Sequence, residues 1–127
     1  MEIGIKGYKE ITVTTDLLAK NVGSGTVEVY ATPMMIAGIE GTAEESVRNL
    51  VGEGKATVGI LMNVTHLSAT PVGMKVRFET ELCAIDGKIL TFNVCAYDEK
   101  DKIGEGTHKR AIVTKASFEE RAKSKLL

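Results

Sequence analysis

The sequence predicts an α+β fold in which a twisted antiparallel sheet wraps around one long central helix. Helical periodicity is strong in one long stretch of the chain body, residues 32–51. After residue 57, apolar and polar residues alternate through most of the chain, as is typical of antiparallel strands with one solvated face. The 127 residues suffice for one ordinary hydrophobic core, so we expect a single domain spanning residues 1–127.

Charge and composition argue against several classes of protein. Sixteen basic and seventeen acidic residues nearly cancel, so no global field favours nucleic acid or a membrane surface. No apolar run approaches the length that spans a bilayer, and the N-terminus has no apolar signal-peptide core. Cys83 and Cys95 make neither a disulfide framework nor a metal site. We therefore expect a cytoplasmic protein without a metal.

Two short strands are predicted before the helix. Residues 8–14 are rich in β-branched and aromatic side chains, which favours a first strand. Residues 21–25 contain Gly-Ser-Gly and should form a flexible connection. Apolar side chains alternate with Glu28 and Tyr30 over residues 27–31, which indicates a second short strand that leads into the helix.

The long helix has recognisable start and stop signals. Pro33 suits the first helical position, and Thr32 before it is a candidate N-cap. Gly-Glu-Gly at 52–54 should end the helix at about Val51. Residues 34–39 contain no polar side chain, so this half of the helix requires burial on all sides and the sheet should curl around it.

Extended strands fill the chain after the helix. Over residues 57–70, one row of side chains is apolar until its late member His66, so the row is expected to face the core: Val58, Ile60, Met62, Val64, His66. Thr70-Pro71 ends this strand. A last strand is expected over residues 103–115, followed by a short helix with a capping box formed by Ser117 and Glu120.

Residues 72–84 and the strand after them should form a hairpin at Asp86-Gly87. A two-residue loop would place the two apolar rows on opposite faces of the sheet. A three-residue loop, 86–88, keeps both rows on one face, and we therefore prefer it. The pairs expected from that loop are Ala84 with Leu90, Leu82 with Phe92, and Phe78 with Ala96.

Three polar residues interrupt apolar surroundings, and each has a structural alternative to a functional role. Thr32 is explained by capping alone. Glu40 lies on the apolar stripe of the helix, where it is either a tolerated carboxylate at the rim or a functional one. His66 ends a core-facing row and is compatible with a structural histidine. His108, on a different strand, is interpreted as structural or as lining the rim of a pocket.

Together these residues suit attack on an acyl carbonyl. A carboxylate in an apolar site can act as a general base, and histidine titrates near neutrality. The first amides of the helix, at Met34 and Met35, are candidates for stabilising an oxyanion. One geometric difficulty is that Thr32 and Glu40 lie roughly 12 Å apart along a regular helix.

Several blocks, in this order and spacing, resemble the hotdog-fold thioesterases related to the fluoroacetyl-CoA thioesterase: Ala31-Thr32-Pro33 before an apolar helix with Glu40, Val64-Thr65-His66, Ala69-Thr70-Pro71 with Gly73, and Gly106-Thr107-His108-Lys109-Arg110. The resemblance, from about Val27 to Thr114, implies a hotdog fold. It also implies a homodimer with active sites at the subunit interface, and a tetramer of two such dimers is the alternative. By position, Thr32, Glu40 and His66 correspond to the family's catalytic residues. Gly59 and Arg110 match positions that orient the substrate or the catalytic group.

The resulting hypothesis is an acyl-CoA thioesterase acting on a short- or medium-chain substrate, with no cofactor because CoA is part of the substrate. Residues 21–25 form a shorter segment than in the fluoroacetyl-specific enzyme and lack its aromatic lid residues, so the resemblance does not carry fluoroacetyl specificity. A non-catalytic module that binds acyl-CoA or senses a metabolite is the alternative. Another hotdog chemistry, such as that of a hydratase, is a third possibility.

Overall fold

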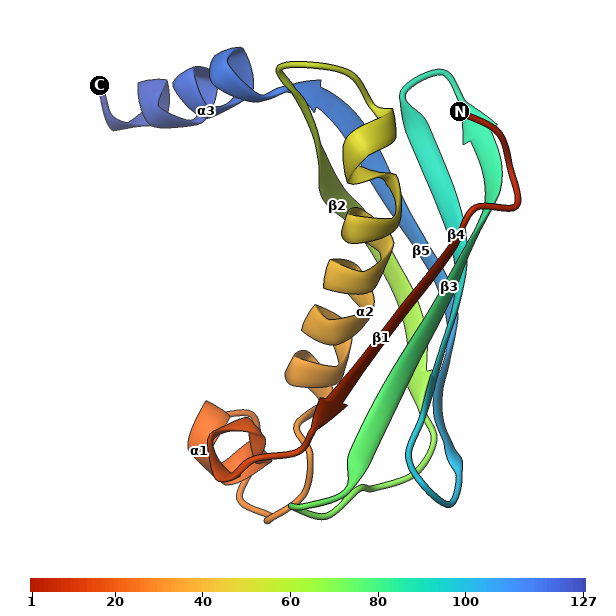
Figure 1. Cartoon of the computed structure of the whole chain (residues 1–127). Coiled ribbons are helices and arrows are strands. Elements are labelled where there is room, and N and C mark those ends of the chain that lie inside the picture. Colours follow the sequence, from red (N-terminus) through yellow and green to blue (C-terminus); the bar gives the residue numbers. More distant parts are fainter.

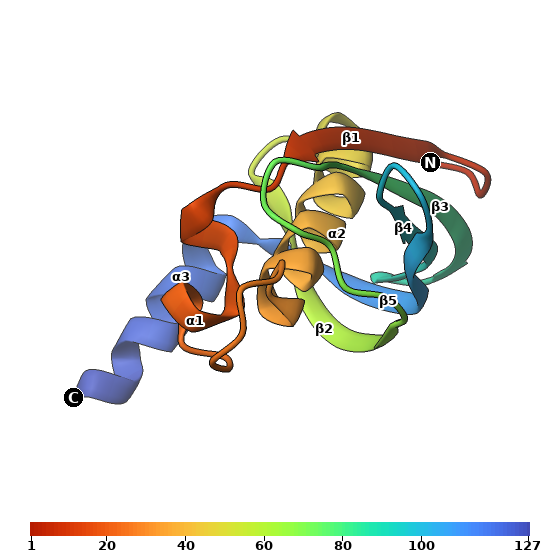
Figure 2. The ribbon, with the colours of Figure 1, turned by 90° about the horizontal axis from the view of Figure 1, so that it is seen from below.

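A five-stranded antiparallel sheet curls around one long helix, α2, in the computed structural model of residues 1–127 (Figures 1 and 2). The order of strands across the sheet is β1-β3-β4-β5-β2. The main elements are β1 (Lys6–Thr12), α2 (Thr32–Val47), β2 (Lys55–His66), β3 (Lys75–Asp86), β4 (Ile89–Tyr97) and β5 (Lys102–Thr114). The predicted α+β architecture, with the sheet wrapped around a central helix, is therefore confirmed.

One face of α2 supplies the centre of the core. Met35, Ile39 and Ala43 recur every four residues on this face and are fully buried. They meet the inner side chains of the sheet, which include Val76, Phe78, Leu82, Leu90, Phe92, Val94 and Ala96. Gly38 lets the helix approach closely, because a Cβ there would lie 2.2 Å from the Phe78 ring. The position of α2 on the sheet is therefore fixed by tight packing.

The start of α2 differs from the prediction by one position. Ala31 occupies the N-cap and Thr32 is already helical, so the prediction of Thr32 as the cap was wrong. The Thr32 hydroxyl instead contacts His66. At its other end, α2 ends at Val47 and a 3₁₀ turn follows over Arg48–Leu50. The helical backbone therefore ends close to the predicted residue 51.

The second predicted strand, over residues 27–31, does not form. The segment contributes only an isolated bridge between Leu18 and Tyr30. The reason is that a short helix, α1 (Ala19–Val22), forms before this segment and overlaps the start of the expected flexible connection. The Val27 and Val29 carbonyls accept the amides of Lys20 and Ala19, so they complete the first turn of α1 instead of joining the sheet. The first strand does form, starting two residues earlier than predicted.

Strand β2 contains a bulge that reverses its alternation. Gly59 pairs with Arg110 and Leu61 with Lys109, which leaves Ile60 as an extra residue. Ile60 is 51% exposed, so the prediction that it faces the core was wrong. Past the bulge, the half-buried Met62 and Val64 belong to the predicted inner row, which ends at His66.

The β3–β4 hairpin also differs from the prediction. Asp86 pairs directly with Ile89, so the loop has two residues and the expected Ala84–Leu90 pair was wrong. A bulge at Cys83 compensates by one position. The pairs of Leu82 with Phe92 and of Phe78 with Ala96 are therefore confirmed.

The C-terminal helix α3 (Lys115–Lys123) projects from the end of β5 and buries no residue (Figure 1). Its N-cap is Thr114 and not the predicted Ser117, whose hydroxyl donates back to the Thr114 carbonyl from inside the helix. The thiols of Cys83 and Cys95 are free, as expected. No helix in the chain combines the length and apolar character needed to cross a membrane.

Candidate active site

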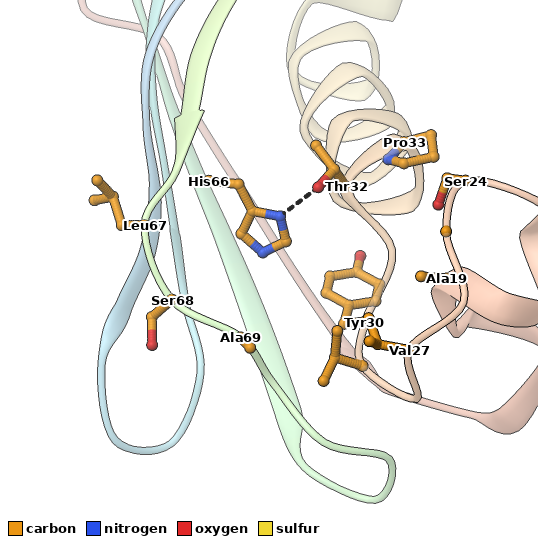
Figure 3. Close-up of a pocket in the computed structure, with 12 residues that line it drawn as sticks. Ala19, Ser24, Val27, Tyr30, Thr32, Pro33, His66, Leu67, Ser68 and Ala69 are labelled. Atoms are coloured by element: carbon orange, nitrogen blue, oxygen red, sulfur yellow. Dashed lines mark hydrogen bonds between the residues drawn. The ribbon is translucent and has the colours of Figure 1, made fainter.

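Thr32 and His66 form a hydrogen-bonded pair between two element ends. Thr32 is the first residue of α2 and His66 the last of β2, and Oγ1 lies 2.7 Å from Nδ1 (Figure 3). The second ring nitrogen of His66, Nε2, is buried and has no hydrogen-bond partner. Burial lowers the pKa of His66, which favours the neutral ring that can accept a proton.

A cavity of about 520 Å³ opens beside this pair. Its walls come from the segment 19–30, the start of α2 and the residues that follow β2 (Figure 3). Ser24 and Gly25 form part of one wall, next to the larger Val27 and Val29 of the same segment. Tyr30 lines it as well and donates its hydroxyl to the Met34 carbonyl at 3.1 Å.

Glu40 belongs to a second polar cluster, centred on Arg110. The guanidinium group of Arg110 is held against Thr57, with Nε donating to Oγ1 at 2.8 Å and Nη2 to the carbonyl at 2.9 Å. Arg110 Nη1 lies 3.4 Å from Glu40 Oε2, and the Glu40 side chain is 43% exposed. The carboxylate that the sequence places on an apolar stripe is therefore paired with a cation.

His108 completes this cluster as a neutral ring of defined tautomer. Its Nδ1 lies 2.9 Å from the Leu61 carbonyl, which can only accept, so Nδ1 carries the proton. Its Nε2 lies 3.2 Å from Arg110 Nη1, which can only donate. Burial lowers the pKa of His108, and the Arg110 cation also lowers it against the opposing effect of the Leu61 carbonyl.

Gly59 leaves the space that Glu40 occupies. A Cβ at Gly59 would lie 2.3 Å from Glu40 Oε2, well inside contact distance. The bulge after Gly59 turns this residue and Thr57 towards α2, on the side of the Arg110 guanidinium. Strict alternation with the predicted core-facing Val58 and Ile60 puts Gly59 on the opposite face, and the bulge explains the difference.

The structure therefore divides the predicted site residues into two groups within one chain. Thr32 lies with His66, while Glu40 lies with Arg110 and Gly59. The Met34 and Met35 amides both donate to the Ala31 carbonyl at 3.0 Å within the chain, and their role in stabilising an oxyanion stays a prediction.

Sequence reasoning also undervalued His108. The interpretation of this residue as structural or rim-lining missed its contact with Arg110. The two residues stand two positions apart on β5, with both side chains buried. Their alternation on one strand, together with the match at Arg110, was the signal that both point the same way.

Solved structures place this fold in a known class. A structure of the fluoroacetyl-CoA thioesterase FlK superimposes with a TM-score of 0.94 at 27% identity, covering 98% of this chain and 97% of that chain. A Thermus thermophilus protein, described as a thioesterase superfamily member, gives a TM-score of 0.89 at 28% identity over 98% of this chain and 95% of that one. The fold and the polar site define the protein as a hotdog-fold thioester hydrolase.

Sequence comparison identifies the family. The family model described as fluoroacetyl-CoA-specific thioesterase matches residues 13–116. The fluoroacetyl-CoA thioesterase of Streptantibioticus cattleyicolor is 34% identical over 98 residues, which is 77% of this chain and 70% of that protein. The chain belongs to the fluoroacetyl-CoA-specific thioesterase family, as the resemblance in its motifs predicted.

Proposed function

We propose that this thioester hydrolase cleaves a short- or medium-chain acyl-CoA to the free acid and CoA. The observation that carries the proposal is the Thr32–His66 pair, whose hydroxyl and ring lie 2.7 Å apart beside a cavity of about 520 Å³. Ser24 and Gly25 line that cavity with little side-chain volume, which favours an acyl group larger than fluoroacetyl. A mutant of the related enzyme FlK has been solved with fluoroacetate and CoA.

In the proposed reaction, water adds to the thioester carbonyl carbon and the C–S bond breaks. Glu40 either takes a proton from that water or attacks the carbonyl itself, forming an anhydride that water then hydrolyses. His66, whose ring is neutral, takes a proton from water and passes it to the CoA sulfur, and Thr32 orients the thioester. Single-turnover hydrolysis in oxygen-18 water separates these routes when water attacks the Glu40 carboxyl carbon of the anhydride, because Glu40 then takes up the label and the released acid carries an unlabelled Glu40 oxygen. In the general-base route the label enters the acid directly.

We propose a homodimer, or a tetramer built from two such dimers, in which the two clusters come from different protomers. Strand β2 supports this, because it lies at the sheet edge with β5 as its only neighbour. Ile60, Leu61 and Leu67, on or just after this strand, are 44–51% exposed. Pairing of two β2 strands would cover them and place Glu40 of one protomer near His66 of the other.

Subunit mixing tests this arrangement directly. Glu40→Ala and His66→Ala chains, unfolded together and refolded as a mixture, should regain about a quarter of wild-type activity, because half the dimers are mixed and one of their two sites is intact. Each variant refolded alone provides the control. No regain from mixtures that form heterodimers would place each complete site within one chain.

The catalytic roles are tested with a panel of acyl-CoA esters. Glu40→Ala and His66→Ala should each lower kcat by about 10²-fold or more. Glu45→Ala is the matched control, since Glu45 lies on the same helix and pairs only with Lys9 at the surface. Wild-type turnover in both site variants would reject the assignment.

We further propose that the reaction uses no cofactor and takes place in the cytoplasm. Glu40 and His66 supply the acid–base groups that thioester hydrolysis needs, and the free thiols Cys83 and Cys95 suit a reducing compartment. Turnover should therefore be unchanged after dialysis against EDTA. A loss restored by a divalent metal would contradict this.

A further inference from the structure

Three cations converge on a cavity at the opposite end of α2 from Thr32. Arg48, Lys55 and Lys115 line this space of about 250 Å³, together with a single carboxylate, Glu44. They come from three elements: the 3₁₀ turn after α2, the start of β2 and the start of α3. The cavity therefore carries an excess of two positive charges on a chain whose formal net charge is −1.

The cations are only partly neutralised within the chain. Arg48 pairs with Glu44, one helical turn earlier, and its side chain is 61% exposed. Lys55 Nζ donates to the neutral Thr114 hydroxyl at 2.7 Å. Neither Lys55 nor Lys115 forms an ion pair with a carboxylate. A cavity of this kind suits a ligand with several negative charges, since Arg and Lys are the side chains that bind phosphate oxygens.

This cation cavity adjoins the Glu40 cluster. Thr57 lines the cavity and also holds the Arg110 guanidinium, whose Nη1 faces Glu40. Along α2, Arg48 follows Glu40 by eight residues, or about 12 Å. The pantetheine arm of CoA has the length of about four extended residues, or about 14 Å. A thioester at Glu40 therefore has an arm of suitable length to place its phosphates among the cations.

We propose that Arg48, Lys55 and Lys115 bind the phosphate groups of the CoA portion of the substrate while the thioester lies at Glu40. This inference rests on the proposed hydrolysis of acyl-CoA. It assigns the cation cavity of one protomer to the leaving group and the cavity beside Thr32 of the other protomer to the acyl end. Recognition at the phosphates is therefore independent of the identity of the acyl group.

The test compares an acyl-CoA with the corresponding acyl-pantetheine, which carries no phosphate. The triple variant Arg48→Gln, Lys55→Gln, Lys115→Gln keeps most of each side-chain stem and removes the charges. Its KM for acyl-CoA should rise about tenfold with little change in kcat, because three partly exposed ionic contacts are lost. Its kinetics on acyl-pantetheine should match those of the wild type.

A second triple variant, Lys6→Gln, Lys88→Gln, Lys100→Gln, removes the same charge from exposed positions elsewhere and should leave both KM values unchanged. The proposal is overturned if the control variant shows an equal rise in KM for acyl-CoA. It is also overturned if the cavity variant shows no rise, or if its KM rises with acyl-CoA and acyl-pantetheine alike. Circular dichroism checks folding, and the three single substitutions replace the triple if it does not fold.

Two further arms separate the possible outcomes. The first arm measures KM for an acyl-dephospho-CoA, which lacks the 3′-phosphate. If the wild type and the cavity variant then have the same KM, the cations contact the 3′-phosphate. If the wild type still has the lower KM, they contact the diphosphate. Wild-type protein that hydrolyses neither acyl-CoA nor acyl-pantetheine would refute the proposed function by itself. In that case, calorimetric binding of CoA to the wild type and to the cavity variant still decides the inference, which requires weaker binding by the variant.

Discussion

Replacing Gly59 with alanine should disable the Glu40 cluster while leaving the fold intact. The added Cβ would lie 2.3 Å from Glu40 Oε2, whereas an ordinary contact begins at about 3.4 Å. The carboxylate must therefore retreat by about 1 Å, which breaks its 3.4 Å contact with Arg110. A misplacement of this size at a reacting group can cost about 10²-fold in rate. Because Glu40 can rotate its flexible end away, the free energy of unfolding should change by less than about 1 kcal/mol.

The assay measures kcat on an acyl-CoA ester beside unfolding in urea. Gly41→Ala is the control, since Gly41 adjoins Glu40 in α2 but a Cβ there meets nothing nearer than Lys9 Nζ at 3.9 Å. That variant should keep its activity. If Gly59→Ala retains wild-type kcat with a normal fold, the position of the Glu40 carboxylate beside Arg110 does not matter for turnover, and the reasoning fails.

Three predictions concern stability. Burial lowers the pKa of His108 below its ordinary value of about 6.5, so the unfolded chain binds the proton more readily. The His108 contribution to stability is therefore complete above that value and is lost as the pH falls towards the lowered pKa, by at most about 1.4 kcal/mol per pH unit. The free energy of unfolding in urea should therefore differ less between pH 7.5 and pH 5.5 in His108→Gln than in the wild type. Gly38→Ala should cost about 1–3 kcal/mol in urea unfolding, because its Cβ would lie 2.2 Å from the Phe78 ring. Asp98→Ala should cost about 2–3 kcal/mol by thermal unfolding, because the buried carboxylate accepts the Thr70 hydroxyl at 2.8 Å and two backbone amides of the following turn.

Each of these three predictions has a contradicting result. An equal pH dependence in the wild type and in His108→Gln would mean that other groups titrate on unfolding. A more stable Gly38→Ala would mean that α2 shifts freely and gains the helix propensity of alanine, about 1 kcal/mol. An unchanged Asp98→Ala would mean that water replaces the carboxylate in the turn.

The sequence was sufficient for features that depend on burial over many residues. The helix at residues 32–47 has one side that must be covered, and the Leu82–Phe92 pair follows because a slip would expose an apolar row. A bulge adds one residue to a strand, and no pattern of apolar and polar residues marks its position. The alternation therefore shows neither the bulge at Ile60 nor the one at Cys83, and the bulge at Ile60 explains why Gly59 points inward.

The candidate site was recoverable as a set of residues but not as an arrangement. Glu40 and Arg110 are 70 positions apart, so no local spacing reveals that the cation faces the carboxylate. The prediction of Thr32 as a cap rests on the preference for threonine just before a helix. The actual cap is Ala31, and this shift of one position leaves the Thr32 hydroxyl available to His66. Only the packing of β2 against α2 could show this.

The bulge in β2 has a consequence for how the chain length can vary in related proteins. Loss of the extra residue Ile60 would restore strict alternation along the strand. Either His66 would then turn to the outer face, or Gly59 and Thr57 would turn away from α2. A deletion of one residue would thus remove one polar cluster without touching any side chain of either. Related proteins that keep both polar clusters should therefore keep the length of β2 between Thr57 and His66 unchanged.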